Sequence, residues 1–127
     1  MYVGYVMIFL AANKLLRLMY CKHVGTVTGD EFRAREEELQ ALMTELGPGF
    51  RFLTDLSELQ SMDKSYPEEL ARVMDELKAG GIKMVVRIIP DPRKDIGLNI
   101  LSVFHYGRAV RTVTCKDFAE AMRVLKV

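Results

Sequence analysis

Two apolar runs at the start of the chain have the composition of β-strands. Residues 2–10 and 15–23 are rich in apolar and aromatic side chains, and residues 11–14 between them include an asparagine, which favours turns. The first run is well short of the roughly 20 apolar residues of a membrane-spanning helix. No basic residues precede it, as they do in a signal peptide. We therefore expect an opening β-hairpin and no membrane span.

Two helix starts are marked by a hydroxyl residue followed three positions later by glutamate. This capping pattern occurs at 28–31 and again at 65–68. After each start, apolar residues recur at helical spacing until a glycine-rich stop, at 47–49 in the first case and at 80–81 in the second. The pattern predicts one helix before each stop.

The segments that follow these helices have strand character. Residues 50–54 form a short apolar strand candidate, and the polar residues 55–64 after it predict a loop. Residues 82–89 are almost continuously apolar and β-branched, which is typical of a central parallel strand.

The last third of the chain predicts a weaker helix, a strand and a closing helix. Residues 95–104 are the weaker helix candidate, and residues 109–113 are the strand. We expect Thr114 to cap the closing helix, whose apolar side is formed by Phe118, Ala121, Met122 and Leu125. The order ββαβαβαβα predicts an α/β fold with a mixed sheet whose parallel strands are joined by right-handed helical crossovers.

Composition adds limits to this picture. A chain of 127 residues, half of them apolar, has the size and balance of a single globular domain spanning 1–127. Its 18 basic and 17 acidic residues give no net field that would attract nucleic acid. Cys21 and Cys115 lack metal-ligand or redox-motif spacing, so we interpret them as reduced thiols in a cytoplasmic protein, although a bridge between them stays an alternative.

Candidate chemistry is sparse. His23 and His105 are far apart and lack the spacing of zinc ligands, so no metal or cofactor is predicted. An enzyme that uses His105 and Asp95 is the least favoured hypothesis, because the sequence indicates no nucleophile nearby. Carboxylate pairs at 55/63 and 91/95 are more typical of caps and turns. A modest basic patch for an anionic ligand or an acidic partner is an alternative for Arg87, Arg93, Lys94, Arg108 and Arg111.

Ser65 is the residue most open to regulation. A phosphate there adds about −1.5 to −2 charges beside the positive end of a helix, and a partner docked on that surface meets a new anion. The simpler interpretation is that Ser65 caps its helix, which contributes about 1 kcal/mol.

Two stretches carry a family resemblance. FLTDLSELQSMDKSYPEELARVMDELKAGGIKMVVRIIPD at 52–91 and RTVTCKDFAEAM at 111–122 resemble the STAS domain, and most closely its stand-alone, SpoIIAA-like branch of anti-sigma factor antagonists. In that family a strand ending in an Asp-Leu-Ser type motif is followed by an Asp-Ser-Ser-Gly segment at a helix start, then a glycine and a buried strand. The closing helix of the family has an acidic residue before a small one, as at 120–121 here. The resemblance implies about five strands and three to four helices.

The resemblance also implies a site at the start of the second capped helix. The phosphorylated serine of the family falls on Ser65 and its aspartate on Asp63, while Lys64 and the Tyr-Pro pair at 66–67 replace a serine and a Gly-Leu pair. A protein partner, an anti-sigma factor or a kinase-like regulator, is then expected to bind through Asp55, Asp63, Lys64 and Tyr66. Phosphorylation of Ser65 is expected to weaken that binding.

The primary hypothesis is therefore a non-enzymatic, STAS-like regulatory module of a bacterial cytoplasm. The alternative is a small-molecule or lipid-binding domain with an apolar pocket near the last helices, lined by Met74, Met84, Phe104 and Tyr106. A homodimer through the apolar first strand is a further prediction, because unpaired apolar edges associate.

Overall fold

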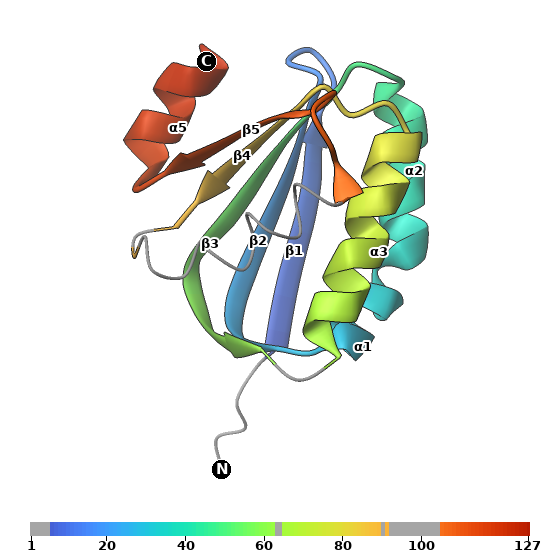
Figure 1. Cartoon of the computed structure of the whole chain (residues 1–127), viewed down its shortest axis with the longest axis vertical. Helices are drawn as coiled ribbons and strands as arrows, with labels where there is room; N and C mark the ends of the chain where they lie inside the picture. The colour runs from blue at the N-terminus through green and yellow to red at the C-terminus, as the bar shows by residue number, and fades with distance from the viewer. Residues whose placement is uncertain (1–5, 63–64, 90, 92–104) are drawn as a thin grey trace.

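The computed structural model describes residues 6–62, 65–89, 91 and 105–127. Figure 1 shows the arrangement of the elements along the chain. In chain order they are β1 (Val6–Asn13), β2 (Leu18–Val27), α1 (Gly29–Ala34), α2 (Glu36–Leu46), β3 (Arg51–Met62), α3 (Tyr66–Ala79), β4 (Met84–Ile88), β5 (Arg111–Cys115) and α5 (Phe118–Leu125).

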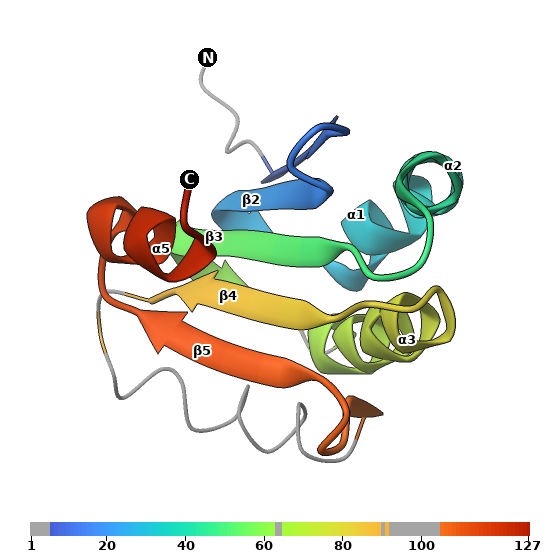
Figure 2. The same cartoon turned by 90° about the horizontal axis from the view of Figure 1, so that it is seen from above.

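One mixed sheet organises the molecule. Its strands lie in the order β1-β2-β3-β4-β5, with β1 and β2 antiparallel and every later pair parallel. In Figure 2 the helices α1, α2 and α3 cover one face of this sheet, and α5 lies on the other. The predicted α/β fold, with an opening hairpin and parallel strands, is confirmed. The helix predicted at 95–104 lies outside the described residues.

The opening hairpin is shifted along the chain relative to the prediction. β1 continues through Asn13, so the turn occupies residues 14–17 instead of 11–14. The Oδ1 atom of Asn13 accepts the backbone N–H of Leu16 at 3.1 Å, and Arg17 takes a positive φ of 51°. Asparagine thus does favour the turn, but it acts from the position that precedes it.

β3, with 12 residues, is more than twice as long as the strand predicted at 50–54. It runs to Met62, so most of the predicted loop at 55–64 is strand. β4 ends at Ile88, opposite Asp55, so the second half of β3 pairs only with β2. The polar side chains of Ser57, Glu58 and Gln60 are therefore exposed on this half of β3. Their polarity is the reason why the sequence pattern predicts a loop here.

The first capped helix is divided in two. The Thr28 hydroxyl accepts the N–H of Glu31 at 3.3 Å, which confirms the predicted cap. The helix predicted up to residue 46 is interrupted at Arg35, whose N–H bonds to the carbonyl of Phe32 only three residues back. This tighter turn separates α1, which packs on α3, from α2, which lies along β1 and β2.

Thr114 does not cap the closing helix. It lies inside β5, which pairs with β4 as far as Cys115, two residues beyond the predicted strand end. The cap of α5 is Asp117, whose Oδ1 accepts the N–H of Glu120 at 2.8 Å. Continued pairing with a buried neighbouring strand thus outweighs the local capping preference of a threonine.

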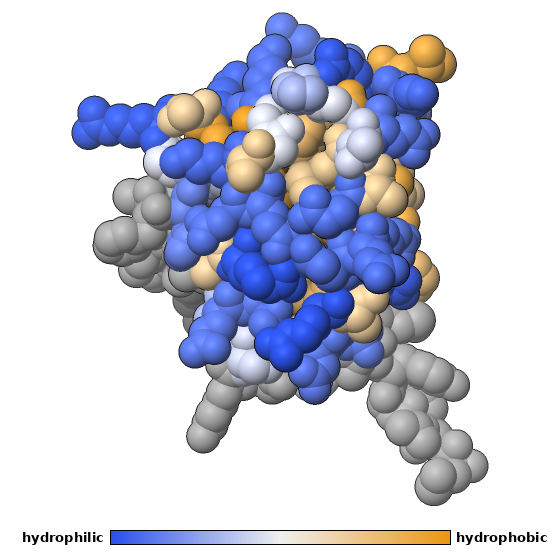
Figure 3. All heavy atoms as spheres, turned by 90° about the vertical axis from the view of Figure 1, so that its right-hand side faces the viewer, coloured by the Kyte–Doolittle hydropathy of each residue, from blue (hydrophilic) through white to orange (hydrophobic). Residues whose placement is uncertain are grey.

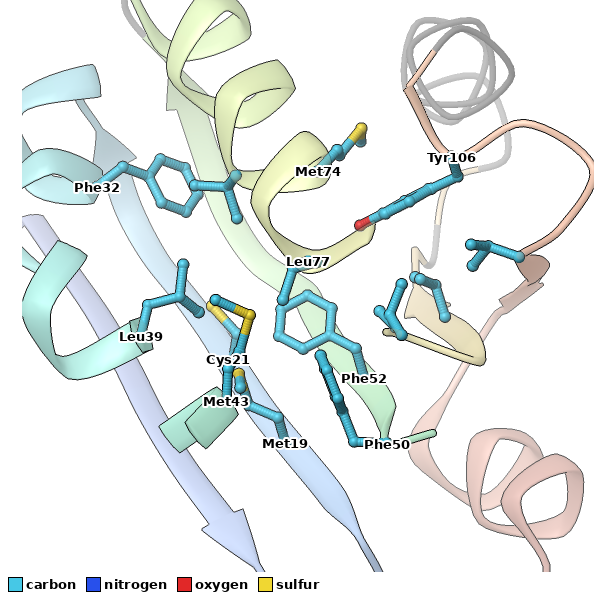
Figure 4. Packing of buried hydrophobic residues seen from close by; sticks show 14 of the residues in the cluster. Met19, Cys21, Phe32, Leu39, Met43, Phe50, Phe52, Met74, Leu77 and Tyr106 are labelled. Atoms are coloured by element: carbon cyan, nitrogen blue, oxygen red, sulfur yellow. The ribbon is translucent and has the colours of Figure 1, made fainter. Parts of the chain in front are cut away.

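The core has two parts, one on each face of the sheet. Figure 4 shows the larger part, where Phe50, Phe52 and Leu77 pack between the sheet and the helices. Alternation along β4 directs Val85 into this part and Met84, Val86 and Ile88 into the smaller part beneath α5. All five residues of β4 are buried, as predicted for a central strand.

Ion pairs hold the outer helices together. Arg72 of α3 binds Glu36 of α2 at 2.6 Å and Glu69 of its own helix at 2.8 Å, and it also contacts Glu76. Arg33 of α1 reaches the same Glu69 at 2.6 Å. Figure 3 shows that this side of the molecule is largely hydrophilic. The network fixes α1 and α2 against α3, where Ser65 lies at the helix start.

Candidate functional site at the start of α3

Ser65 directly precedes α3 but does not cap it. Its backbone is already helical, with φ −84° and ψ −15°, and its side chain makes no capping hydrogen bond. The prediction of a reciprocal cap between Ser65 and Glu68 is therefore wrong, because a cap residue needs an extended backbone to turn its hydroxyl toward the helix. Pro67 lies in the first turn of α3, where its missing N–H leaves no helical hydrogen bond unmade.

The Ser65 hydroxyl instead joins the starts of two helices. Its Oγ accepts the backbone N–H of Gly29, the first residue of α1, at 3.2 Å. A Cβ at position 29 would lie 2.4 Å from this Oγ and 2.9 Å from the Ser65 carbonyl oxygen. Glycine at 29 thus permits the close approach of α1 to the half-buried Ser65.

Gly29→Ala is expected to lower the free energy of unfolding by about 1–3 kcal/mol, because the added methyl overpacks this junction. The clash outweighs the helix preference of alanine, about 1 kcal/mol. Ser65→Gly in the Gly29→Ala background is expected to recover only part of the loss, since the carbonyl oxygen of residue 65 remains 2.9 Å away. Urea denaturation measures the free energy of unfolding of the wild type, Gly29→Ala and the double variant. A Gly29→Ala protein as stable as the wild type would disprove the close approach.

Tyr66 lies next to Ser65 but belongs to the core. Its side chain is 1% exposed, and its hydroxyl oxygen is 2.9 Å from Nδ1 of His23 on β2. The other ring nitrogen of His23 is 3.3 Å from Sγ of Cys21. Phe32 of α1 packs edge-on against the imidazole, with ring centroids 5.3 Å apart. Tyr66 therefore offers no side chain to a partner, contrary to the prediction.

Burial makes this polar cluster unreactive at neutral pH. It lowers the pKa of His23 from 6.5 to about 4 and raises the pKa of the Cys21 thiol to about 12. The pKa of Tyr66 is also raised by burial. The imidazole is thus neutral but only weakly basic, and the thiol is protonated, so the cluster holds neither a general base matched to neutral pH nor a thiolate nucleophile.

Asp55 is buried within β3 and not in an exposed loop. Its Oδ1 accepts both the N–H and the hydroxyl of Ser57, at 2.9 and 2.6 Å, and the Tyr20 hydroxyl lies 3.4 Å from Oδ2. The side chain is 7% exposed, so the predicted partner contact through Asp55 does not fit its position. Asp63 and Lys64 lie outside the described residues.

Comparison with known proteins identifies the fold. No family model and no curated protein matches the sequence. Among solved structures, an uncharacterized Shewanella loihica protein of the DUF3478 family with a SpoIIAA-like fold superposes with a TM-score of 0.73 at 15% identity, covering 98% of this chain and 97% of that one. The anti-sigma factor antagonist SpoIIAA in its unphosphorylated form gives 0.60 at 14% identity, covering 96% and 98%. The chain has the SpoIIAA-like fold.

A third similar structure is an anti-sigma factor antagonist from Mycobacterium paratuberculosis, with a TM-score of 0.58, 16% identity and coverage of 97% and 96%. At such identities the likeness establishes the SpoIIAA-like architecture. It agrees with the resemblance seen in the sequence.

The apolar cavity of this SpoIIAA-like fold is small. It lies between the sheet and α3 and has a volume of about 30 Å³, and two of the four residues proposed to line a ligand pocket, Met74 and Tyr106, are in its wall. Met84 is not in the wall, because alternation along β4 turns it toward α5. Phe104 lies outside the described residues. A volume of this size holds about one water molecule.

The remaining candidates are dispersed. Arg87 is 2% exposed and lines the cavity, so it does not belong to a surface patch, and Arg93 and Lys94 lie outside the described residues. His105 has its Nδ1 2.8 Å from Oδ1 of Asp75, while Asp95 lies outside the described residues. Where the structure describes the chain, no three His, Cys, Asp or Glu side chains converge as metal ligands, and none of the described helices has the length and hydrophobicity to cross a membrane.

The capping pattern in the sequence marks Ser65, but neither of the two contacts that define its surroundings was predictable from it. The Ser65 and Gly29 pair is 36 residues apart in sequence, and the Tyr66 and His23 pair is 43 apart. One local signal was present, because glycine is a poor helix former and yet directly follows the Thr28 cap. A glycine at that position indicates close approach of another backbone or side chain.

Proposed function

We propose that this protein is a non-enzymatic regulatory module of the bacterial cytoplasm that binds a protein partner at the adjoining starts of α1 and α3. The proposal is supported by the likeness to two anti-sigma factor antagonists and by the position of Ser65 at this junction. Exposed residues beside it are Asp30, Pro67 and Glu68. The partner is an anti-sigma factor or a kinase-like regulator.

The protonation states of the buried groups support a role in binding over catalysis. The polar cluster nearest the junction holds a neutral imidazole and a protonated thiol, both buried. A catalytic group needs contact with substrate and a pKa near the working pH. These groups satisfy neither condition, so they stabilise the core under the binding surface.

Phosphorylation of Ser65 is the proposed switch, and the contact with Gly29 supplies its mechanism. The single observation that carries this proposal is the 3.2 Å hydrogen bond from Gly29 N–H to Ser65 Oγ. A phosphate on this oxygen is far bulkier than a hydroxyl and does not fit against the Gly29 backbone. Phosphorylation therefore moves the start of α1 away from α3 and adds negative charge, and both changes alter the partner surface.

The test uses the wild type, Ser65→Ala and Ser65→Asp as affinity baits in an extract of the native cell. Proteins captured specifically by the wild type are expected to be retained by Ser65→Ala and lost by Ser65→Asp. Gln60→Glu is the charge control, because Gln60 is exposed on the neighbouring end of β3 and leaves the Ser65 contact intact. Equal recovery with Ser65→Ala and Ser65→Asp would remove the switch.

Self-association through β1 is the remaining partner proposal. β1 is an edge strand of the sheet, and none of its eight residues is charged, whereas the opposite edge, β5, carries Arg111. Phe9 on β1 is 47% exposed. Uncharged edges favour strand pairing between chains.

Both cysteines are free and buried, which agrees with a reducing compartment.

The ligand-binding alternative finds less support in the geometry. The cavity of about 30 Å³ between the sheet and α3 has room for water but not for a lipid chain. Binding of a larger apolar ligand requires α3 to move away from the sheet. A thermal-shift screen of fatty acids that raised the melting temperature would restore this alternative.

A further inference from the structure

The end of the sheet opposite Ser65 brings five chain segments together. Strand pairing aligns Leu18, Arg51, Met84 and Arg111 in one row across β2 to β5. The β1–β2 turn lies just beyond this row, as Figure 1 shows at the top of the molecule. Arg51 also donates to the carbonyl oxygen of Leu125 at 2.5 Å, so the end of α5 is fixed there too.

Every charged residue in these five segments is basic. Residues 13–18, 47–51, 80–84, 107–111 and 123–127 contain no aspartate or glutamate, although the whole chain has 17 acidic residues. All of their basic side chains are exposed except that of Arg51, which is half-buried. The basic residues are Lys14, Arg17, Arg51, Lys83, Arg108, Arg111, Arg123 and Lys126. Within these segments the eight basic residues have no acidic counterpart, a local excess that the net charge of +1 does not reveal.

Apolar side chains project from the same end. Leu15 at the tip of the turn is 96% exposed and Leu16 is 38% exposed, with Lys14 and Arg17 on either side. Val127 at the end of the chain is 47% exposed. Among the described residues, the other exposed large hydrophobic residues are Phe9 and Phe118. In Figure 3 a hydrophobic projection stands at the upper end among hydrophilic side chains.

The turn is held rigidly enough to present these leucines. The Arg17 guanidinium bonds to the carbonyl oxygens of Leu46, at 3.3 Å, and of Pro48, at the end of α2. Arg51 donates to the carbonyl oxygen of Leu16 at 3.1 Å. Arg17 and Arg51 thus fix the turn by hydrogen bonds, while Lys14 and Leu15 are exposed.

We propose that this basic end docks on an anionic phospholipid surface, with Leu15 and Leu16 inserted at the boundary between headgroups and acyl chains. Basic residues attract anionic headgroups, and apolar side chains gain from shallow burial in the bilayer. A nucleic acid backbone would satisfy the positive charges but leave the leucines against a polar surface. This docking uses the opposite end of the sheet from Ser65, so it goes beyond the proposed function and each can fail without the other.

Vesicle co-sedimentation at low salt tests the proposal. The wild type is expected to bind phosphatidylcholine vesicles that contain phosphatidylglycerol and not to bind vesicles made only of phosphatidylcholine. It is expected to dissociate from the anionic vesicles as the salt concentration is raised. Lys14→Gln with Lys83→Gln is expected to weaken binding about 25-fold, at roughly fivefold for each basic residue lost. Leu15→Ser is expected to weaken it roughly tenfold without changing the charge.

Lys116→Gln is the matched control, because Lys116 is exposed but follows the other end of β5. It removes one positive charge and is expected to leave vesicle binding unchanged. The proposal is overturned if the wild type does not bind phosphatidylglycerol vesicles, if Lys116→Gln weakens binding by the roughly fivefold expected for one basic residue of this end, or if Leu15→Ser has no effect. Preferential binding of duplex DNA in a competition with the vesicles would also overturn it.

Discussion

Replacing Tyr66 with alanine is expected to lower the free energy of unfolding by about 3–5 kcal/mol, the usual cost of removing a fully buried aromatic ring. The Tyr66 side chain is 1% exposed and packs against Phe32 and His23, with ring centroids 5.2 and 5.9 Å away. Truncation enlarges the cavity of about 30 Å³ whose wall Tyr66 helps to form. Urea denaturation followed by circular dichroism measures the loss.

Tyr66→Phe separates the contribution of the ring from that of the hydroxyl. It keeps the packing and removes the hydroxyl together with its contact to His23 Nδ1, so the expected loss is about 1 kcal/mol. A Tyr66→Ala protein as stable as Tyr66→Phe would contradict the buried position. It would instead return Tyr66 to the surface, where the sequence-based hypothesis placed it as a partner contact.

The second large effect is a loss of stability in mild acid that depends on His23. Burial lowers the pKa of His23 from 6.5 to about 4 in the folded protein. Between these values the unfolded chain takes up a proton at His23 and the folded protein does not, so unfolding becomes more favourable as the pH falls. The expected contribution is on the order of 3 kcal/mol, lost between about pH 6.5 and pH 4.

His23→Gln isolates this contribution, because glutamine stays neutral over the whole range. Carboxylates such as Glu69, whose pKa is lowered by hydrogen bonds from Arg33 and Arg72, add their own acid sensitivity to both proteins. The difference between wild type and variant therefore reports His23 alone. Its measure is the free energy of unfolding in urea at a series of pH values. Parallel curves for the two proteins would show that His23 is not buried as a neutral ring.

The sequence predicted the architecture well, because its strongest signals are local and repeated. The apolar stripe of α3 and the continuous apolar run of β4 each depend on one period and one burial environment. Boundaries were less predictable where tertiary pairing decides them. β3 extends through polar residues because β2 supplies a partner strand, and α5 is capped by Asp117 because β5 continues through Thr114.

The candidate site was predictable in position but not in its contacts. The capping pattern at Ser65 located a helix start correctly, although the hydroxyl bonds to Gly29 and not to its own helix. The burial of Tyr66 depends on His23, which lies on another strand. The net charge of +1 likewise gave no indication of the basic end, because only the folded sheet brings those segments together. Contacts between distant segments leave little trace in a single sequence.

The most direct test of the central claim is amide hydrogen exchange at Gly29, compared among the wild type, Ser65→Asp and Gln60→Glu. Faster exchange is expected at Gly29 and its neighbours in α1 for Ser65→Asp alone, with the amides of β4 unchanged in all three proteins. Equal protection of the Gly29 amide in Ser65→Asp and the wild type would show that a bulkier, charged side chain at residue 65 does not separate the two helices, and the proposed switch would have no structural basis.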